Sequence, residues 1–145
     1  LASEASVPAA AVSCTDDQTG IGFDGDRYSP PLDPAWTRDS DFPALRRAAA
    51  QLAAYFAGER KAFDLPLAPA GTPFQKAVWK AIEGVPAGAT ISYAELARRA
   101  GHPGSARAAG AATGRNPLAI VVPCHRIVGS DGSLTGYAGG LDRKR

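Results

Sequence analysis

The chain has 145 residues, of which 45% are hydrophobic and 21% charged, a balance that is typical of folded globular proteins and excludes wholesale disorder. No apolar run approaches the roughly 18 residues of a membrane span, and the start of the chain lacks the features of a signal peptide. Two cysteines cannot form a disulfide framework. We therefore expect a cytoplasmic protein of bacterial type. The net charge of +2 divides unevenly, since residues 1–72 carry 10 acidic and 6 basic side chains and residues 73–145 carry 4 and 10.

The acidic half begins with short predicted elements. Residues 5–27 mix Val, Ile and Thr with Asp and Gly turns, a pattern that predicts short strands. Residues 29–41 are rich in Pro and Asp and are expected to form a loop. A helix is predicted over residues 43–57, with Asp41 as its cap and Gly58 as its stop. Its apolar face is expected to consist of Leu45, Ala49, Leu52 and Phe56.

Residues 62–71 are expected to form an extended linker, and the charge changes sign just after them. We therefore predict an α+β protein of two parts. Residues 1–71 would form a small N-terminal α/β domain with a short sheet, and residues 72–145 a mostly helical C-terminal domain. Excess positive charge in one half is typical of a surface that faces a polyanion, although chance segregation of surface charge would give the same asymmetry.

The basic half opens with two strong helix starts. Residues 72–75, TPFQ, have the pattern of a capping box with Pro at the first helical position, and an apolar stripe continues to Ile82. Glycines between residues 84 and 88 end this helix. Residues 92–95, SYAE, predict a second capping box, which opens a short helix that ends at Gly101.

A tight turn at residues 102–104 leads to another short helix over residues 106–112, which Ser105 is expected to cap. Two short helices across a glycine-containing turn form the pattern of a helix-turn-helix. The second helix is almost entirely Ala and Gly, so it would either approach another surface closely or pack in a core. Arg107 favours the first interpretation, because a guanidinium in such a helix must face water or a ligand. We therefore expect this helix to face DNA.

The next segment joins an apolar run to a cysteine. Residues 118–122 are expected to form a buried strand, which Pro123, Cys124 and His125 follow directly. Cys124 has two interpretations: a small buried hydrophobic residue, or a reactive thiolate whose pKa is lowered by the imidazole and by basic neighbours. Cys14 lies in an ordinary strand-like context and is interpreted as structural. No zinc-ligand spacing links the cysteines and histidines, so no metal is expected.

The motifs around Cys124 form an ordered set. They are TPFQKAVWKAI at 72–82, SYAELA at 92–97, ARAAG at 106–110, GRNP at 114–117 and PCHRIVGSDGSLTGYAGGL at 123–141. In this order they resemble the O6-alkylguanine-DNA alkyltransferases, also called methylated-DNA–protein-cysteine methyltransferases. The resemblance covers residues 72–145 and is weaker over residues 1–71. It implies a DNA repair protein that moves an alkyl group irreversibly to its own cysteine, once per molecule and without a cofactor.

The resemblance also implies a role for each matching residue. Cys124 matches the acceptor thiol, which displaces the alkyl group in line with guanine as leaving group. His125 matches the general base, which removes the thiol proton through a water. Asn116 matches the residue that braces the turn between the recognition helix and the active site. Tyr93 matches the tyrosine that reaches the flipped base and can protonate the leaving purine.

The same resemblance implies that the partner is double-stranded DNA carrying O6-alkylguanine. It also implies that a winged-helix-like helix-turn-helix contacts the minor groove, and that the protein is a monomer that could cluster on DNA. Arg107 matches the finger that fills the gap left by the flipped nucleotide. The other residues expected at the DNA surface are Ser105, Ala106, Ala108, Gly110 and Arg115. The residues expected to form the alkylguanine pocket are Tyr93, Ile127, Tyr137 and Ala138, with backbone carbonyls of Cys124 and Ile127 as acceptors.

One feature departs from the family pattern. The family completes a Cys–His–Glu relay with a glutamate in a C-terminal helix, whereas no glutamate follows Cys124 in this sequence. We expect that glutamate in a tail beyond Arg145, because without it the imidazole has no carboxylate to orient it. Three alternatives remain: a non-catalytic alkyltransferase-like damage binder, which the presence of Cys124 disfavours, a helix-turn-helix transcription factor and a cysteine hydrolase.

Overall fold

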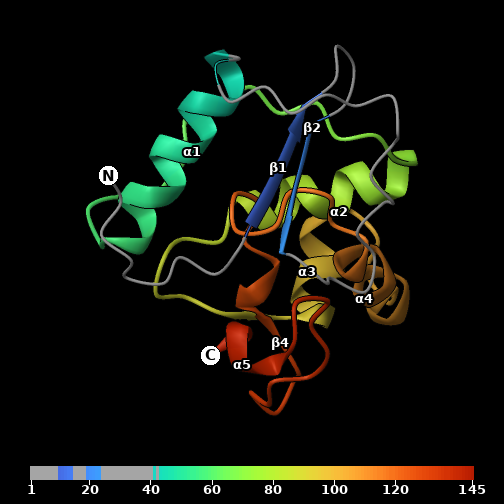
Figure 1. Ribbon diagram of the computed structural model, residues 1–145. Coiled ribbons are helices and arrows are strands. Elements are labelled where there is room, and N and C mark those ends of the chain that lie inside the picture. Colours follow the sequence, from blue (N-terminus) through green and yellow to red (C-terminus); the bar gives the residue numbers. More distant parts are fainter. Residues whose placement is uncertain (1–9, 15–18, 24–40, 42) are drawn as a thin grey trace.

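The computed structural model describes residues 10–14, 19–23, 41 and 43–145 (Figure 1). Most of the loop predicted at 29–41 and the side chain of Cys14 lie outside this description. The described segments contain two small two-stranded sheets and five α-helices, which confirms the predicted α+β class. No helix within these ranges is both long enough and apolar enough to cross a membrane.

Two antiparallel strands open the described chain. Strand β1 (Ala10–Cys14) pairs with strand β2 (Thr19–Phe23), which confirms the short strands expected in this segment. Ile21 in β2 is buried, and its backbone binds the chain that leads to the cysteine. Its N–H donates to the Pro117 carbonyl at 2.7 Å, and its own carbonyl accepts from the Ala119 N–H at 2.8 Å. The acidic half thus supports the segment that precedes Cys124.

Helix α1 (Pro43–Phe56) packs against β1 and ends, as predicted, just before Gly58. Gly58 has a φ of 77°, a left-handed conformation that favours glycine. The predicted apolar face is confirmed at Leu52 but is rotated elsewhere, because Ala49 and Phe56 are exposed. The residues that α1 buries are Ala48, Gln51 and Leu52.

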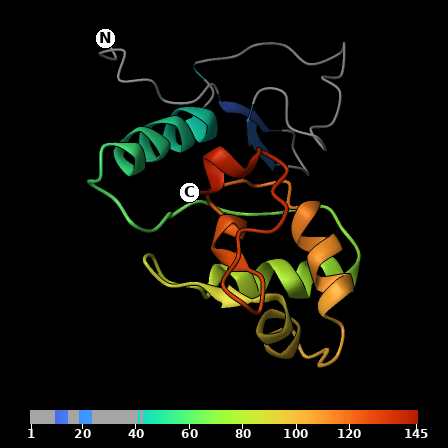
Figure 2. The same cartoon turned by 90° about the horizontal axis from the view of Figure 1, so that it is seen from below.

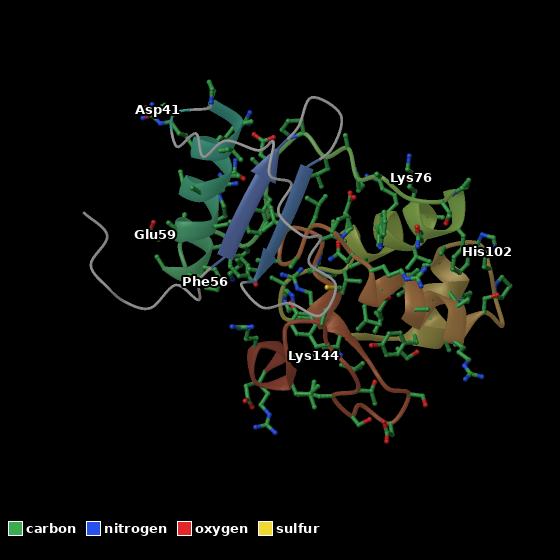
Figure 3. The ribbon with its side chains drawn as sticks, turned by 45° about the vertical axis from the view of Figure 1, so that its right-hand side comes forward. Asp41, Phe56, Glu59, Lys76, His102 and Lys144 are labelled. Carbon is green, nitrogen blue, oxygen red and sulfur yellow. The ribbon has the colours of Figure 1, made fainter. Side chains whose placement is uncertain are left out.

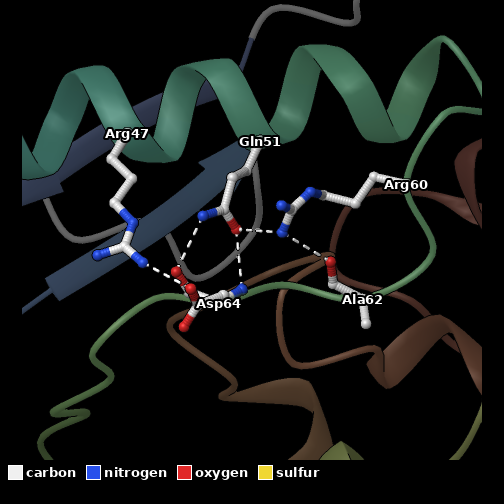
Figure 4. Close-up of polar contacts among 5 residues, drawn as sticks. All are labelled: Arg47, Gln51, Arg60, Ala62 and Asp64. Atoms are coloured by element: carbon white, nitrogen blue, oxygen red, sulfur yellow. Dashed lines mark hydrogen bonds and ion pairs between the residues drawn. The ribbon is translucent and has the colours of Figure 1, made fainter.

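A polar side chain near the middle of α1 explains that rotation (Figure 4). Gln51 Nε2 donates to the Asp64 carbonyl and Gln51 Oε1 accepts from the Asp64 N–H, both at 2.9 Å. Arg60 donates to the same Oε1 at 2.9 Å and to the Ala62 carbonyl at 3.0 Å, while Arg47 pairs with the exposed Asp64 carboxylate at 2.6 Å. Since both the oxygen and the nitrogen of this buried amide are hydrogen-bonded, it can take the place of an apolar residue and fix the extended linker along the helix.

Helix α2 (Pro73–Glu83) begins with the predicted capping box. The Thr72 hydroxyl accepts from the Gln75 N–H at 3.2 Å, and the Gln75 side-chain oxygen accepts from the Thr72 N–H at 2.9 Å. On its buried face, the Trp79 indole N–H donates to the Ala112 carbonyl at 2.9 Å. This bond ties α2 to the helix that was predicted to face DNA.

Helices α3 (Tyr93–Arg99) and α4 (Ala106–Gly114) pack on α2 and on each other, across the hairpin from α1 (Figures 1 and 2). Of the two caps predicted here, the one at Ser92 is partly confirmed and the one at Ser105 is wrong. The Ser92 hydroxyl accepts from the Glu95 N–H at 3.2 Å, but the Glu95 carboxylate binds two arginines later in α3, so this capping box is half formed. Ser105 precedes α4 without a side-chain cap bond, because its backbone is not extended.

Residues 118–122 are buried but do not form the predicted strand. Ile120 has a φ of 72°, and the Val121 N–H donates to the Ala119 carbonyl at 2.8 Å. These features make a γ-turn centred on Ile120, which is strained because Ile is β-branched. Pro123 is the centre of a second turn, an inverse γ-turn, which is the unstrained form. The Cys124 N–H closes this turn by donating to the Val122 carbonyl at 2.7 Å. Within the described residues, the pairing of this segment is limited to two isolated bridges, Ile21 with Leu118 and Ala119 with Val122.

A short parallel pair aligns α3 with the cysteine. Strand β3 (Ile91–Ser92), directly before α3, pairs with β4 (Ile127–Val128), directly after the 3-10 turn Cys124–Arg126. This pairing sets the first residue of α3 beside the cysteine turn. A glycine-rich loop then leads to the last helix, α5 (Leu141–Lys144).

Candidate functional site

A cavity of about 200 Å³ adjoins Cys124. The predicted site residues that line it are Tyr93, Gly110, Asn116, Cys124, Tyr137 and Ala138. Thr113 and Gly114 of α4 and Gly136 and Gly139 of the loop after β4 also contribute. The side chain of Ile127, predicted for the pocket, is instead fully buried in the hydrophobic core.

Tyr93 forms one wall of this cavity. It is the first residue of α3, so the β3–β4 pairing fixes its backbone beside the cysteine turn. Its hydroxyl donates to the Thr135 carbonyl at 3.3 Å. Burial raises the pKa of Tyr93 above its ordinary value near 10, so the phenol keeps its proton at neutral pH.

Asn116 holds the turn that carries the cysteine. Its Oδ1 accepts from the Leu118 N–H at 3.0 Å, which forms an Asx-turn. Its Nδ2 donates to the Val122 carbonyl at 2.8 Å and to the Cys124 sulfur at 3.1 Å. One amide therefore connects Leu118, before the γ-turn at Ile120, with Cys124, after the turn at Pro123. This geometry agrees with the bracing role expected for Asn116.

Cys124 is buried, with 6% of the residue exposed. Burial raises its pKa, although hydrogen bonds from Asn116 and Tyr137 and the positive charge of Lys144 act in the opposite direction. Of the two interpretations of Cys124, a raised pKa favours the neutral thiol over the thiolate in the protein alone, because removal from water outweighs the neighbouring donors and charge. The sulfur rests as a neutral thiol.

His125 is half-buried in the same turn. Burial, followed by the charges of Arg126 and Lys144, lowers its pKa to about 4. The imidazole is therefore neutral at pH 7 and free to accept a proton. In the described part of the chain no direct hydrogen bond joins it to Cys124, and its side chain does not line the cavity.

Lys144 is the site residue that the sequence did not reveal. It points inward from α5 (Figure 3) and is 5% exposed. Its ammonium donates to the carbonyls of Thr135 and Gly136 at 2.8 and 3.0 Å and lies 5.9 Å from the centre of the Tyr93 ring. Nothing in the polar run DRKR distinguishes it from its exposed neighbours.

The helix predicted to face DNA presents small and basic residues to solvent. Arg107 and Ala108 of α4 and Arg115 just after it are exposed, while Ser105, Ala106 and Gly110 are half-buried. On α3, Arg98 and Arg99 are each held at 2.7 Å by Glu95. The free cationic surface of this region is thus centred on α4 rather than α3.

The two histidines lie in different turns. His102 occupies the exposed turn between α3 and α4, well to one side of Lys144 (Figure 3), whereas His125 lies in the 3-10 turn Cys124–Arg126. Among residues 43–145 and the strands of the hairpin, no three His, Cys, Asp or Glu side chains are grouped closely enough to hold a metal ion.

Family comparisons agree with this arrangement. A model described as "6-O-methylguanine DNA methyltransferase, DNA binding domain" matches residues 73–145, and one described as "6-O-methylguanine DNA methyltransferase, ribonuclease-like domain" matches residues 12–69. The chain belongs to the 6-O-methylguanine DNA methyltransferase family. The resemblance seen in the sequence motifs is therefore confirmed.

Individual relatives of this family are similar over most of the chain. A methylated-DNA–protein-cysteine methyltransferase of Methanosarcina acetivorans is 54% identical over 110 residues, which cover 76% of this chain and 69% of the relative. One of Mycolicibacterium paratuberculosis is 51% identical over 120 residues, covering 83% and 72%.

Solved structures of the 6-O-methylguanine DNA methyltransferase family share the fold. The crystal structure of Mycobacterium tuberculosis OGT in complex with DNA has a TM-score of 0.84 and 46% identity, covering 92% of this chain and 80% of that one. The structure of Mycobacterium tuberculosis O6-methylguanine methyltransferase has a TM-score of 0.69 and 42% identity, covering 94% and 88%.

Proposed function

We propose that this protein repairs DNA by moving the alkyl group of an O6-alkylguanine to Cys124, once per molecule and without a cofactor. The observation that carries the proposal is the position of the Cys124 thiol, in a chain of this family, at a cavity of about 200 Å³ that Tyr93 and Tyr137 also line. Aromatic walls suit a planar base that has left its stack in the duplex. A methyl group on O6 is the smallest lesion of this class.

The proposed step uses two proton carriers. His125, neutral at pH 7, accepts the thiol proton through a water. The thiolate attacks the alkyl carbon, so that a carbon–sulfur bond forms while the carbon–oxygen bond breaks and its electron pair stays on guanine. Tyr93 donates its phenolic proton to the leaving purine, and solvent carries the proton of His125 back to Tyr93. Because a thioether is a poor leaving group, the alkylated cysteine stays modified.

For DNA, we propose that α3 and α4 act as a winged-helix-like helix-turn-helix in the minor groove. The exposed guanidinium of Arg107 would fill the space of the flipped nucleotide. The remaining DNA surface would comprise Ser105, Ala106, Ala108, Gly110 and Arg115. The minor groove carries little sequence information, which suits repair in any sequence context. Residues 72–145 would then form the DNA-binding and alkyl-acceptor domain of a monomer, and residues 1–71 the supporting domain.

The test is intact mass spectrometry of the protein before and after incubation with a duplex that contains O6-methylguanine. We expect a gain of one methyl group per molecule, located on Cys124 and absent from Cys124→Ala. Arg107→Ala should slow transfer from the duplex far more than transfer from the free base. Tight binding to the damaged duplex without any methyl gain would contradict the proposal and favour the non-catalytic damage binder.

A further inference from the structure

A second cavity adjoins the segment that carries Cys124. It has a volume of about 500 Å³ and shares no lining residue with the cavity at Cys124. Ala119 and Cys124 line the cavity at Cys124, whereas Ile120, Val121 and Pro123 line the second cavity. One short segment therefore borders two separate cavities, and the proposed function uses only the first of them.

The second cavity has the composition of a small-molecule site. Its walls come from the linker, from the turn after α2 and from the segment that leads to Cys124, and they are mostly apolar. The larger apolar side chains are those of Phe63, Leu67, Val85, Ile120 and Val121. The charged side chains are those of Lys61, Glu83 and Arg126. Ligand sites of this size commonly combine apolar walls with a few polar groups that orient the ligand.

Arg126 is a half-buried cation in the wall of the second cavity. Its Nη1 donates to the Val85 carbonyl at 2.7 Å, and the ion pairs of the described residues do not include its guanidinium. A guanidinium has five N–H donors, so most of them remain for another acceptor. A charge held partly away from water is costly unless an opposite charge accompanies it. The position of Arg126 therefore favours an anion in this cavity.

The other two charges at the second cavity leave it net positive. The Glu83 carboxylate pairs with the Lys80 ammonium at 2.9 Å, so its negative charge is already countered. Lys61 is exposed and forms no ion pair within the described ranges. The second cavity thus presents two cations without partners, Lys61 and Arg126, beside one carboxylate that has a partner.

We propose that the second cavity binds a small organic anion, a monocarboxylate with an aromatic or branched apolar body. Its carboxylate pairs with Arg126, because the planar guanidinium suits the two oxygens of that group. Its body packs against Phe63 and Ile120, and Lys61 attracts it at the exposed side of the cavity. Binding is reversible and no covalent bond forms. The site goes beyond the proposed function, because it concerns a different cavity and a different ligand.

Occupation of the second cavity has an effect at His125. Burial, followed by the charges of Arg126 and Lys144, lowers the pKa of His125 to about 4. A carboxylate beside Arg126 offsets part of that positive charge, so it should raise the pKa of His125. A neutral ligand of the same shape has no charge that could do so. The titration of His125 therefore reports whether the carboxylate lies beside Arg126.

The experiment titrates 2-naphthoate into the 145-residue chain at pH 7 and follows the methyl groups of Ile120 and Val121 by NMR. For a probe of this size we expect a dissociation constant of about 1 mM or lower, with NOEs between the naphthalene ring and those methyl groups. 2-Naphthamide keeps the ring but lacks the charge, and it should bind about tenfold more weakly or worse. Acetate keeps the charge but lacks the ring, and it should not displace 2-naphthoate at equal concentration.

Three variants separate the charges. Arg126→Gln should weaken 2-naphthoate binding about tenfold to hundredfold and abolish the rise in the pKa of His125. Lys61→Glu keeps the proposal testable even if Arg126→Gln does not fold, because Lys61 is exposed, and it should weaken binding about threefold to tenfold. Arg46→Gln removes an exposed charge of α1 that does not line the cavity. This matched control should leave both the affinity and the titration of His125 unchanged.

Several results would overturn the proposal. They are the absence of saturable binding below about 10 mM, equal affinity for 2-naphthoate and 2-naphthamide, and NOEs to Ala138 in the cavity at Cys124 instead of to Ile120 and Val121. A dimer in sedimentation that excludes the probe would also overturn it, because a second copy of the chain would then cover the cavity. None of these measurements uses DNA, so their outcome is independent of methyl transfer to Cys124.

Discussion

Replacement of Asn116 by Ala tests how the cysteine turn is held. The substitution removes three hydrogen bonds, to the Leu118 N–H, the Val122 carbonyl and the Cys124 sulfur. Leu118 is fully buried, so its N–H loses its partner without gaining water, at a cost of about 1–3 kcal/mol. The Val122 carbonyl still accepts from the Cys124 N–H at 2.7 Å, so the loss of its bond to Asn116 lowers the free energy of unfolding by only about 1 kcal/mol. We expect a total loss of about 2–4 kcal/mol, equal to roughly 10 °C in Tm for a chain of this size.

The assay is urea unfolding at pH 7, followed by iodoacetamide titration of Cys124. Asn116→Ser is the matched variant, because a serine hydroxyl can still accept from the Leu118 N–H but reaches neither the Val122 carbonyl nor the sulfur. It should recover about 1 kcal/mol of the lost stability. Both variants should raise the pKa of Cys124, since both remove a donor to its sulfur. A loss below 1 kcal/mol in Asn116→Ala, or an unchanged thiol pKa in both variants, would refute the reasoning.

Four further substitutions test separate parts of the fold. Gln51→Ala frees the linker and should cost about 2 kcal/mol in urea unfolding. Gly71→Ala would bring a Cβ within 2.6 Å of the Trp79 ring and should cost about 1–3 kcal/mol by the same measurement. Glu95→Gln frees two arginines and should strengthen DNA binding at low salt, with a steeper dependence on salt concentration. Folding favours the neutral form of His125, so its contribution to the free energy of unfolding is complete above about pH 6.5 and is lost as pH falls towards 4. In thermal melts recorded across this pH range, His125→Gln should make Tm depend less on pH.

Elements with strong local signals were predictable from the sequence. Helix α2 carries its cap, its proline and its apolar stripe within its own residues, and its predicted start agrees with the structure. Helix α1 was found for similar reasons, with Gly58 at its end. The residues predicted to surround Cys124 mostly line one cavity because their motifs come from a family with a shared fold.

The remaining features depend on contacts between distant residues. The burial of Gln51 follows from the backbone of a linker 13 residues away, which no helical periodicity encodes. The segment around Ile120 has the β-branched, apolar residues of a strand, and the positive φ of Ile120 and the isolated bridges seen in the described residues are not encoded in that pattern. The burial of Lys144 depends on two carbonyls of a loop with no regular structure. The sign of the Cys124 pKa shift depends on burial, which the neighbouring basic residues did not reveal.

The neutral, buried thiol of Cys124 has a consequence for the lifetime of the unused protein. Small oxidants and electrophiles of the cell react with thiolates much faster than with thiols. The sulfur of a buried cysteine that holds its proton is therefore shielded from peroxide and from metabolites that would otherwise consume it. For a molecule that reacts only once, as proposed here, the low reactivity of the resting state preserves the stock of active protein until a damaged base enters the cavity.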